Sequence, residues 1–281
     1  MPARRVRTLV LSSCLALSLS WSSDTGLAPD LLAAPAPETF TVMSLNLAMQ
    51  DDVDRLVAGI RLAGGDAADI LVLQEVVQNK DEPSVADRIA VELGLEAVFR
   101  PSFKIGDDRS IGLATLSRFP IVDARPLPLK KFSLGYRSRE RTALRVTLDT
   151  PAGPLRTYNV HLDTRINGGD RVDQVADIIQ DIDTASGGAL VAGDFNTNEN
   201  LWLLHTIPLP FLGRQGSSLE HYMARHGLRS AFDGGATHDT LRMRLDWMFL
   251  KDMRATARAI HPTKVSDHHA LLVSLTPAQR P

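Results

Sequence analysis

Cysteine is almost absent from this chain, since Cys14 is the only one among its 281 residues. Exported domains without a sufficient core are commonly stapled by disulfides, and a single cysteine excludes that solution within one chain. The length and the 44% share of hydrophobic residues instead allow a sizeable buried core. The protein must therefore derive its stability from core packing.

Aromatic residues and an excess of positive charge are also lacking. Aromatic side chains make up 5% of the chain, with three tryptophans and three tyrosines, which leaves little material for an exposed aromatic hairpin that docks on a membrane. The formal net charge is −2, whereas a protein that holds nucleic acid through its overall charge is normally markedly basic. Any chemistry on phosphate groups must therefore depend on local positive charge.

The N-terminal segment has the layout of a secretory signal. Arginines precede an apolar run at residues 9–19, which is too short and too rich in serine for a membrane span. We predict a signal peptide and linker at residues 1–36, and hence a secreted or periplasmic protein. An uncleaved signal anchor is the alternative. Lipid attachment at Cys14 is less favoured, because the apolar run continues beyond it.

Short apolar runs alternate with helical patterns from Phe40 onward. Strands are predicted at residues 40–48, 69–76, 96–100, 111–117, 141–148, 155–162, 189–195, 244–250 and 269–275. Helices are predicted within residues 52–65, 84–94 and 171–182. A hairpin turn is predicted at residues 149–154. We find neither an internal repeat nor a linker, so the pattern favours one α/β domain at residues 37–281, with sheet packed on sheet and helices outside.

Polar side chains that can hold a metal ion or move a proton stand at the ends of the predicted strands. These residues are Asn46, Glu75, His161, Asp194, Asn196, Asp246, Asp267 and His268. Apolar strand interiors do not tolerate unpaired carboxylates, so such residues mark a sheet edge that opens to water or lines a site. A solvated turn explains any one of them better, but their number favours a site.

The residue types indicate a particular chemistry. Carboxylate and asparagine oxygens are ligands that Mg²⁺ or Mn²⁺ prefers, whereas zinc favours histidine and cysteine. A hard divalent ion keeps open positions that suit a phosphate ester. A histidine paired with an aspartate supplies a base or a phosphate contact near neutral pH. Together these types predict metal-assisted hydrolysis of a phosphate ester.

The same residues resemble the motifs of the endonuclease/exonuclease/phosphatase superfamily. The stretches "SLN", "LQE", "GDFN", "LDWMF" and "SDHHA" occur in the family's order between residues 40 and 275. The resemblance implies a four-layer α/β/β/α sandwich with two packed mixed, mainly antiparallel sheets. It places the site at the strand ends of those sheets.

The resemblance also implies a role for each matching position. Glu75 would be the principal Mg²⁺ ligand, with Asn46 and Asp267 near the metal. Mn²⁺ is the alternative ion. Asp194 would position or deprotonate the attacking water, and Asn196 would hold a phosphate oxygen.

The remaining roles concern the histidines. Asp246 would orient His268, which would contact the scissile phosphate or act as general base. His161 corresponds to a histidine of the deoxyribonuclease, sphingomyelinase and inositol-phosphatase branches, where abasic-site repair enzymes have tyrosine. We find no clear acidic partner for His161: Asp163, two residues along the same strand and so on the same face, is either that partner or a residue that faces solvent. Strand alternation predicts that His269 packs between layers.

Two basic features leave alternatives open. Arg171 would reach a substrate phosphate or, as is more common in a helix's first turn, form a surface or structural salt bridge. The stretch at residues 130–145 carries six cationic side chains against one acid. It would bind a phosphodiester backbone or anionic headgroups, or it is a solvated loop and strand face.

The sequence therefore predicts an exported, Mg²⁺-dependent phosphoesterase, with phosphodiesters favoured over monoesters. Its substrate would be nucleic acid, a phospholipid or sphingolipid headgroup, or an inositol phosphate. We expect a monomer without an obligate protein partner. The alternative is a noncatalytic binding protein on the same scaffold, which is disfavoured because it would have lost metal-binding or water-positioning residues.

Overall fold

The computed structural model describes residues 39–134, 139–184 and 186–278. The signal peptide and linker predicted at residues 1–36, including Cys14, lie outside these ranges and stay predictions. Among the described residues, no helix combines the length and the apolar content that a bilayer span needs.

One six-stranded sheet has the order β13-β14-β1-β2-β4-β3. Its strands are β1 (Phe40–Asn46), β2 (Ile70–Asn79), β3 (Glu96–Ile105), β4 (Arg109–Ser117), β13 (Met253–Pro262) and β14 (His269–Pro277). β1 pairs in parallel with β2, and the other pairs are antiparallel. Because β1 and β2 run the same way, Asn46 at the end of β1 lies beside Gln74, the residue before Glu75.

The second six-stranded sheet has the order β11-β12-β8-β7-β6-β5. Its strands are β5 (Ile121–Pro128), β6 (Thr142–Thr150), β7 (Gly153–His161), β8 (Gly188–Asp194), β11 (Arg229–Ser230) and β12 (Asp246–Lys251). β7 and β8 are parallel, and the register sets Asp194 between His161 on β7 and Asp246 on β12. Three predicted site residues are therefore neighbours across one end of this sheet.

Four helices and one small hairpin complete the described fold. The helices are α1 (Val53–Leu62), α2 (Val85–Leu93), α3 (Gly168–Asp183) and α4 (Gln215–Arg225), with a 3-10 turn η1 at Gly65–Ala67. β9 (Leu201–Leu203) pairs only with β10 (Ile207–Leu209).

Local signals account for the ends of α2. At its start, the Ser84 hydroxyl accepts a hydrogen bond from the Asp87 amide (3.1 Å), and the Asp87 carboxylate accepts one from the Ser84 amide (2.9 Å). At its end, Gly94 adopts the left-handed conformation (φ 66°), which glycine enters without steric cost. The helix thus begins and ends where the sequence predicts.

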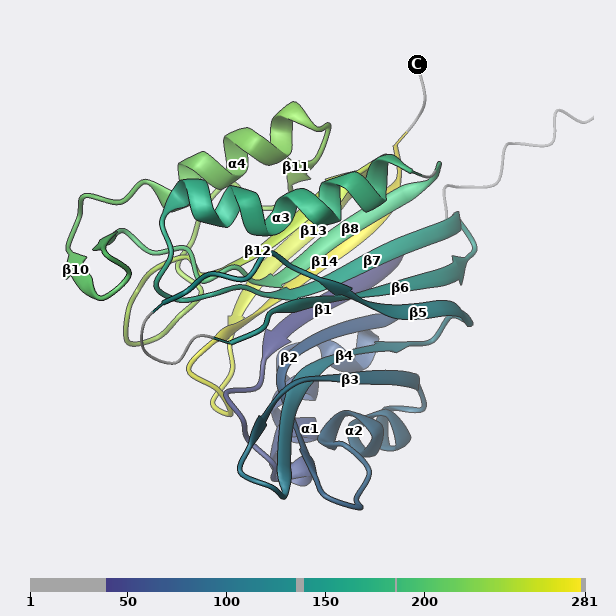
Figure 1. Cartoon of the computed structure of the whole chain (residues 1–281). Helices are drawn as coiled ribbons and strands as arrows, with labels where there is room; N and C mark the ends of the chain where they lie inside the picture. The colour runs from purple at the N-terminus through teal and green to yellow at the C-terminus, as the bar shows by residue number, and fades with distance from the viewer. Residues whose placement is uncertain (1–38, 135–138, 185, 279–281) are drawn as a thin grey trace, which may run out of the picture. The chain divides into compact units, whose positions relative to one another are not determined.

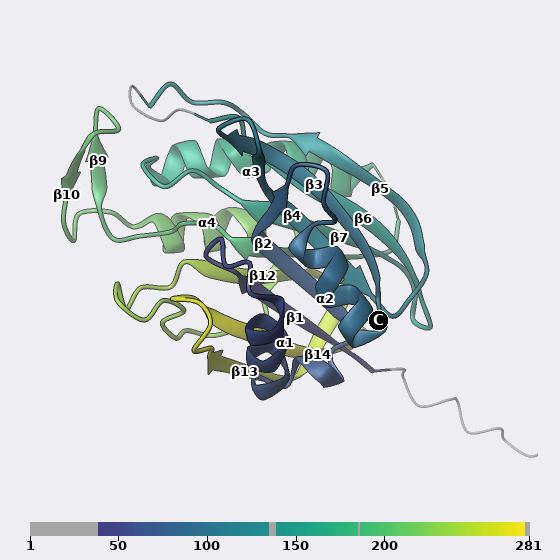
Figure 2. The same ribbon diagram turned by 90° about the horizontal axis from the view of Figure 1, so that it is seen from below.

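The two large sheets face each other, with a pair of helices on each outer face (Figures 1 and 2). Alternation along β1 illustrates this arrangement: Met43 and Leu45 belong to the core beneath α1 and α2, whereas Phe40 and Val42 belong to the core between the sheets. A third core lies between the second sheet and α3 with α4. The predicted four-layer α/β/β/α sandwich of mixed, mainly antiparallel sheets is confirmed.

Besides the short β9, β10, β11 and η1, the longer elements β5, β13 and α4 were not predicted from the sequence. β5 and β13 are edge strands that carry exposed residues on both faces, so their apolar alternation is weak. β5 also contains Pro126 and Pro128, which a strand accepts at an edge because proline has no N–H to donate. In α4 only Gln215, Leu219 and Met223 are buried, which is too narrow a stripe to recognise.

Asp181 in the last turn of α3 ties this helix to the second sheet. Its carboxylate accepts hydrogen bonds from Arg125 Nη2 (2.6 Å), Arg145 Nη1 (3.4 Å) and Tyr158 Oη (2.8 Å). Burial opposes the ionisation of Asp181, but Tyr158 and the two arginines outweigh it, so the pKa of Asp181 is lowered.

We expect Asp181→Asn to lower the free energy of unfolding at pH 7 by about 2 kcal/mol, the scale of hydrogen bonds to a charged group. A carboxyl whose folded-state pKa is depressed stabilises the protein above its unfolded value of about 4, and this contribution is lost as the pH falls through the folded-state pKa. Urea unfolding at pH 7 and pH 3 should therefore give a smaller difference from wild type at pH 3.

Asp183→Asn is the matched control. Asp183 pairs with Lys251 (2.9 Å), but 53% of its side chain is exposed. Its loss should cost less than about 1 kcal/mol. A penalty for Asp181→Asn that is no larger, or that does not change with pH, would contradict the role of Asp181.

Candidate active site

The predicted site residues come from strands of both sheets and meet at one end of the sandwich. Asn46 ends β1, Glu75 lies in β2, His161 ends β7 and Asp194 ends β8. Asp246 starts β12, Asp267 and His268 immediately precede β14, and Asn196 follows β8 by two residues. Contacts link these residues to one another.

Glu75 owes its position to a break in the β2 ladder. The pairing of β2 with β4 shifts between Leu73 and Val76, so Gln74 and Glu75 form a bulge. Glu75 has a positive φ of 52°, which is rare for a residue with a side chain. Its neighbour Gln74 points into the interior, where Gln74 Nε2 donates to Asn159 Oδ1 (2.8 Å). The bulge thus directs the Glu75 carboxylate into the site.

Asp194 lies at the centre of the contacts. Its Oδ2 accepts a hydrogen bond from Asn46 Nδ2 (3.1 Å), and its Oδ1 accepts one from the backbone amide of Asn196 (2.8 Å). The carboxyl is buried, and this burial raises its pKa to about 7, partly offset by His268. Asp194 can therefore take up a proton near neutral pH.

His268 and Asp246 form a buried pair. The Nδ1 of His268 lies 2.9 Å from Asp246 Oδ2, and the Asp246 amide donates to Thr237 Oγ1 (3.0 Å). Burial alone would lower the pKa of His268, but the carboxylates of Asp246, Asp194 and Asp267 outweigh it and raise the pKa to about 10. The ring is thus held as an imidazolium, with Nε2 4.0 Å from Asp194 Oδ2.

His161 lies opposite His268 and has a different charge state. Its Nε2 is 3.5 Å from Asp194 Oδ2 and 3.8 Å from Glu75 Oε1. Burial, together with the positive charges of Arg141 and His268, lowers the pKa of His161 well below its usual value. The sequence left its acidic partner open, and the nearby carboxylates are Glu75 and Asp194. Asp163 is buried and pairs with Arg141 (2.9 Å).

The donor set suits a hard divalent cation. Asn46, Glu75, Asp194 and Asp267 offer oxygen ligands, and burial raises the pKa of Glu75, which means that its negative charge is poorly compensated by the protein. A cation would remove this penalty. The close groups among the described residues are Asp194, Asp246 and His268, and His238, Asp267 and His268.

His238 is a site residue that the sequence did not reveal. Its Nε2 lies 3.3 Å from Asp267 Oδ2, and its ring meets that of His268 edge to face at 4.9 Å. The Leu241 amide donates to His238 Nδ1 (3.2 Å), so Nε2 carries the proton that faces Asp267. A lone histidine in "ATHDT" carries no spacing signal, and only its position beside the "SDHH" segment identifies it.

His269 differs from the prediction. Instead of packing between layers, its Nε2 contacts Asp239 Oδ1 at 2.6 Å, and the ring is partly exposed. His269 is the first residue of β14, where the strand has only begun. Alternation is a weak guide there, because the neighbouring loop still determines the surroundings of the side chain.

Arg171 fits neither of its two predicted roles. The side chain is fully buried and reaches no surface partner or open cleft. Its guanidinium donates to the carbonyls of Asp163 (2.9 Å), Ile166 (3.3 Å) and Phe195, and to Gln215 Oε1 (2.8 Å). Arg171 therefore fixes the loops that follow β7 and β8, which carry the site.

The basic stretch divides between two environments. Arg139 and Arg141 line a 370 Å³ cleft together with Glu75, His161 and Arg165. Arg145 lies elsewhere and pairs with Asp123 and Asp181. Part of the predicted basic stretch thus faces the site, and part holds α3 and the second sheet together.

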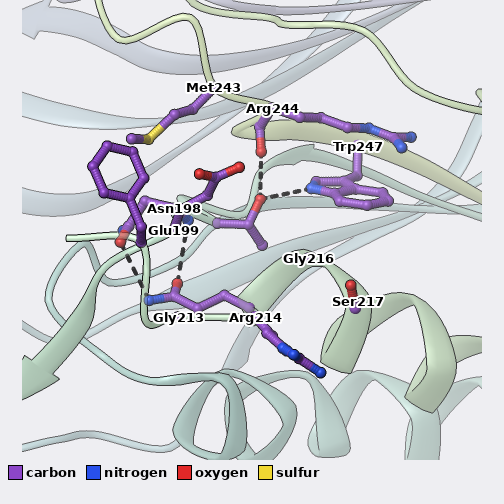
Figure 3. Close-up of a pocket in the computed structure, with 12 residues that line it drawn as sticks. Asn198, Glu199, Gly213, Arg214, Gly216, Ser217, Met243, Arg244 and Trp247 are labelled. Carbon is purple, nitrogen blue, oxygen red and sulfur yellow. Dashed lines mark hydrogen bonds between the residues drawn. The ribbon is translucent and has the colours of Figure 1, made fainter. Parts of the chain in front are cut away.

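A second cavity of 460 Å³ lies beside the site (Figure 3). Two of its lining residues adjoin site residues in the sequence: Thr197 follows Asn196, and Trp247 follows Asp246. Arg244 stacks on the Trp247 ring (3.5 Å from guanidinium carbon to centroid), and Trp247 Nε1 donates to Thr197 Oγ1 (2.8 Å). Arg214 and Phe211 also line it.

The strand ends of the two facing sheets thus gather carboxyl and imidazole groups. The pKa values of His161 and His268 are shifted in opposite directions, and that of Asp194 is raised to about 7. Such a set defines a general acid–base site on an α/β sandwich. The sequence matches the model of the Endonuclease/Exonuclease/phosphatase family over residues 43–268. The chain belongs to this family, whose members are hydrolases that act on phosphate esters.

Solved structures have the same fold. An endonuclease/exonuclease/phosphatase from Beutenbergia cavernae DSM 12333 is 20% identical, with a TM-score of 0.68, covering 86% of this chain and 72% of its own. A family protein from Leptotrichia buccalis C-1013-b is 17% identical (TM-score 0.64, 84% and 99% covered). ANGEL2, a 2′,3′-cyclic phosphatase in complex with adenosine-2′,3′-vanadate, is 17% identical (TM-score 0.61, 86% and 97% covered). A comparison of the sequence with curated proteins finds no match.

The site predicts that His161 and His268 titrate at opposite extremes. In the metal-free protein, an NMR titration of the ring nitrogens should find His268 still protonated above pH 8 and His161 still neutral below pH 6. An ordinary histidine changes charge roughly between these two pH values. Asp246→Asn should lower the pKa of His268 because it removes the adjacent negative charge. Two rings that both titrate near the ordinary value of about 6.5 would contradict this electrostatic description.

Proposed function

We propose that the protein is a divalent-metal-dependent phosphodiesterase, with Mg²⁺ as the preferred ion and Mn²⁺ as the alternative. The observation that carries this proposal is the pairing of a buried Asp194, whose pKa is raised to about 7, with a protonated His268 held by Asp246. A base and a cationic phosphate contact thus stand side by side next to oxygen ligands.

Glu75, Asn46 and Asp267 would hold the ion. A bound Mg²⁺ would supply Lewis acidity at a phosphate oxygen. The carboxylate of Asp267 is 52% exposed, with one oxygen 3.3 Å from His238 Nε2, so a ligand can reach it. The bulge that sets Glu75 gives the principal ligand a fixed direction.

The protein's own groups account for the proton transfers and the orientation of the substrate. Asp194 would take the proton of the attacking water, since its pKa of about 7 matches neutral pH. The imidazolium of His268 would donate a hydrogen bond to the phosphate oxygen that gains charge. Asn196, fixed by its bond from Nδ2 to the Leu162 carbonyl (3.0 Å), would contact another phosphate oxygen.

A phosphodiester substrate is favoured over a monoester by the surroundings of the site. The cleft beside Glu75 and His161 is lined by Arg139, Arg141 and Arg165, which suits a chain or headgroup that extends beyond one phosphate. ANGEL2, similar in fold, is a phosphatase of 2′,3′-cyclic phosphates, which are phosphodiesters. Nucleic acid, phospholipid or sphingolipid headgroups and inositol phosphates all fit this chemistry. A noncatalytic binding protein fits less well, because the whole acid–base set is retained.

We further propose an exported, monomeric protein with no obligate protein partner. The support is the N-terminal layout of residues 1–36, with lipid attachment at Cys14 as the less favoured route.

Turnover of bis-p-nitrophenyl phosphate tests the activity. We expect hydrolysis with Mg²⁺ or Mn²⁺ and none with EDTA. Asp194→Ala and His268→Ala should each reduce the rate by about 10³-fold, the scale of a lost general acid or base. His269→Ala is the matched control and should stay near the wild-type rate, because the polar contact of the His269 ring is to the exposed Asp239. Activity in EDTA, or a His268→Ala variant as fast as His269→Ala, would refute the mechanism.

Metal binding is tested separately by calorimetry without substrate. Glu75→Gln should weaken Mg²⁺ or Mn²⁺ binding at least about tenfold, because an amide replaces the principal anionic ligand. Glu82→Gln, an exposed carboxylate beyond the end of β2, should bind as wild type does. Unchanged binding in Glu75→Gln would remove Glu75 from the metal site.

A further inference from the structure

The hairpin segment, defined here as residues 201–212, concentrates exposed apolar side chains. Half of the exposed large hydrophobic residues in the described part of the chain lie in it. They are Leu201 (38% exposed), Leu203 (49%), Leu204 (79%), Ile207 (52%), Phe211 (81%) and Leu212 (64%). A contiguous exposed group of this kind marks an interaction surface, whereas single exposed leucines need no explanation.

The turn of the hairpin holds Leu204 in a sterically unfavourable backbone conformation. The Thr206 amide donates to the Leu203 carbonyl (3.1 Å), and the two residues between them, Leu204 and His205, have φ of 51° and 57°. Such a turn normally uses asparagine and glycine, because a bulky side chain in this conformation is sterically unfavourable. Keeping a leucine at the exposed tip indicates that the side chain itself is used.

The hairpin segment is fixed to the loops of the active site. Asn167 forms two hydrogen bonds with the backbone of Trp202, at 2.8 and 3.0 Å. His205 Nδ1 lies 2.9 Å from the carbonyl of Arg165, a residue that lines the cleft of Glu75 and His161. In Figures 1 and 2 the β9–β10 pair stands apart from both large sheets. Whatever docks on the hairpin segment is therefore brought next to the site.

Cationic groups flank the apolar side chains. Arg214 is exposed two residues after Leu212. With Arg244 and Phe211 it lines the 460 Å³ cavity, where Glu199 is the acidic residue (Figure 3). Lys130 lies over Phe132, whose ring contacts that of His205 at 6.4 Å, although Lys130 also pairs with Asp173. An apolar tip with a cationic base matches an anionic lipid surface.

We propose that the hairpin segment docks on a bilayer that contains anionic phospholipid. Its three-residue strands rise about 10 Å, which matches the depth to which peripheral proteins bury apolar groups at the headgroup and acyl boundary. Pairing with another protein strand is disfavoured, because β10 is short and Pro208 has no N–H to donate. This inference extends the proposed function, since a docked site would meet phospholipid headgroups, but its test does not depend on turnover.

The experiment is co-sedimentation of the full chain, in the form that the cell produces, with vesicles. One set of vesicles is phosphatidylcholine alone, and the other is an equal mixture of phosphatidylcholine and phosphatidylglycerol. We expect binding to the mixed vesicles that falls with added salt and is weaker on phosphatidylcholine. The double variant Leu204→Asn/Phe211→Asn should lose binding at least about tenfold, because two large apolar side chains no longer leave water. Asparagine tolerates positive φ, so the hairpin fold should persist.

Leu62→Asn is the matched control, since Leu62 on α1 is 78% exposed and distant in sequence and layer from the hairpin. It should bind vesicles as wild type does, and all three proteins should hydrolyse bis-p-nitrophenyl phosphate equally. Absence of wild-type binding, equal binding by the double variant, or an equal loss in Leu62→Asn would overturn the inference. A wild-type dimer in analytical ultracentrifugation that the double variant lacks would assign the surface to a second copy instead. Failure of turnover alone would concern only the proposed function.

Discussion

The arrangement of the active site depends on a guanidinium that is buried among backbone carbonyls. Burial lowers the pKa of Arg171 to about 9, which still leaves the group charged at neutral pH. Its donors are used on Asp163, Ile166, Phe195 and Gln215, so one side chain joins two loops and the start of α4. A neutral residue of that size would leave several buried carbonyls without donors, at a cost of about 1–3 kcal/mol each.

The second requirement is charge balance among the buried acids. Asp194, Asp246 and Glu75 are near one another, and the protein supplies one imidazolium, at His268, as their nearest counter-charge. His161 does not contribute because burial keeps it neutral. The site is therefore short of positive charge in the absence of a ligand, and a divalent cation is the kind of ligand that removes this shortage.

Sequence reasoning was sufficient where the signal was local. Strand runs that end in polar residues predicted the position of the site, because a buried strand interior excludes unpaired carboxylates. The alternation of strands and helices predicted sheet packed on sheet, and the family resemblance implied the four layers. Contacts made across the fold were beyond it. The residues next to Arg171 in sequence do not show that carbonyls from two loops meet at its guanidinium, and those next to His238 do not show that it faces Asp267. The aromatic count also misjudged the hairpin segment, whose exposed surface is built mainly from leucine and isoleucine.

The bulge at Gln74 and Glu75 has an evolutionary consequence. Because the ladder between β2 and β4 resumes at Val76 after one irregular step, deleting a single codon here would restore regular pairing. The same deletion would turn the Glu75 carboxylate away from the site. A single deletion could therefore keep the sandwich fold and remove hydrolysis. Selection for catalysis thus has to maintain the bulge in β2.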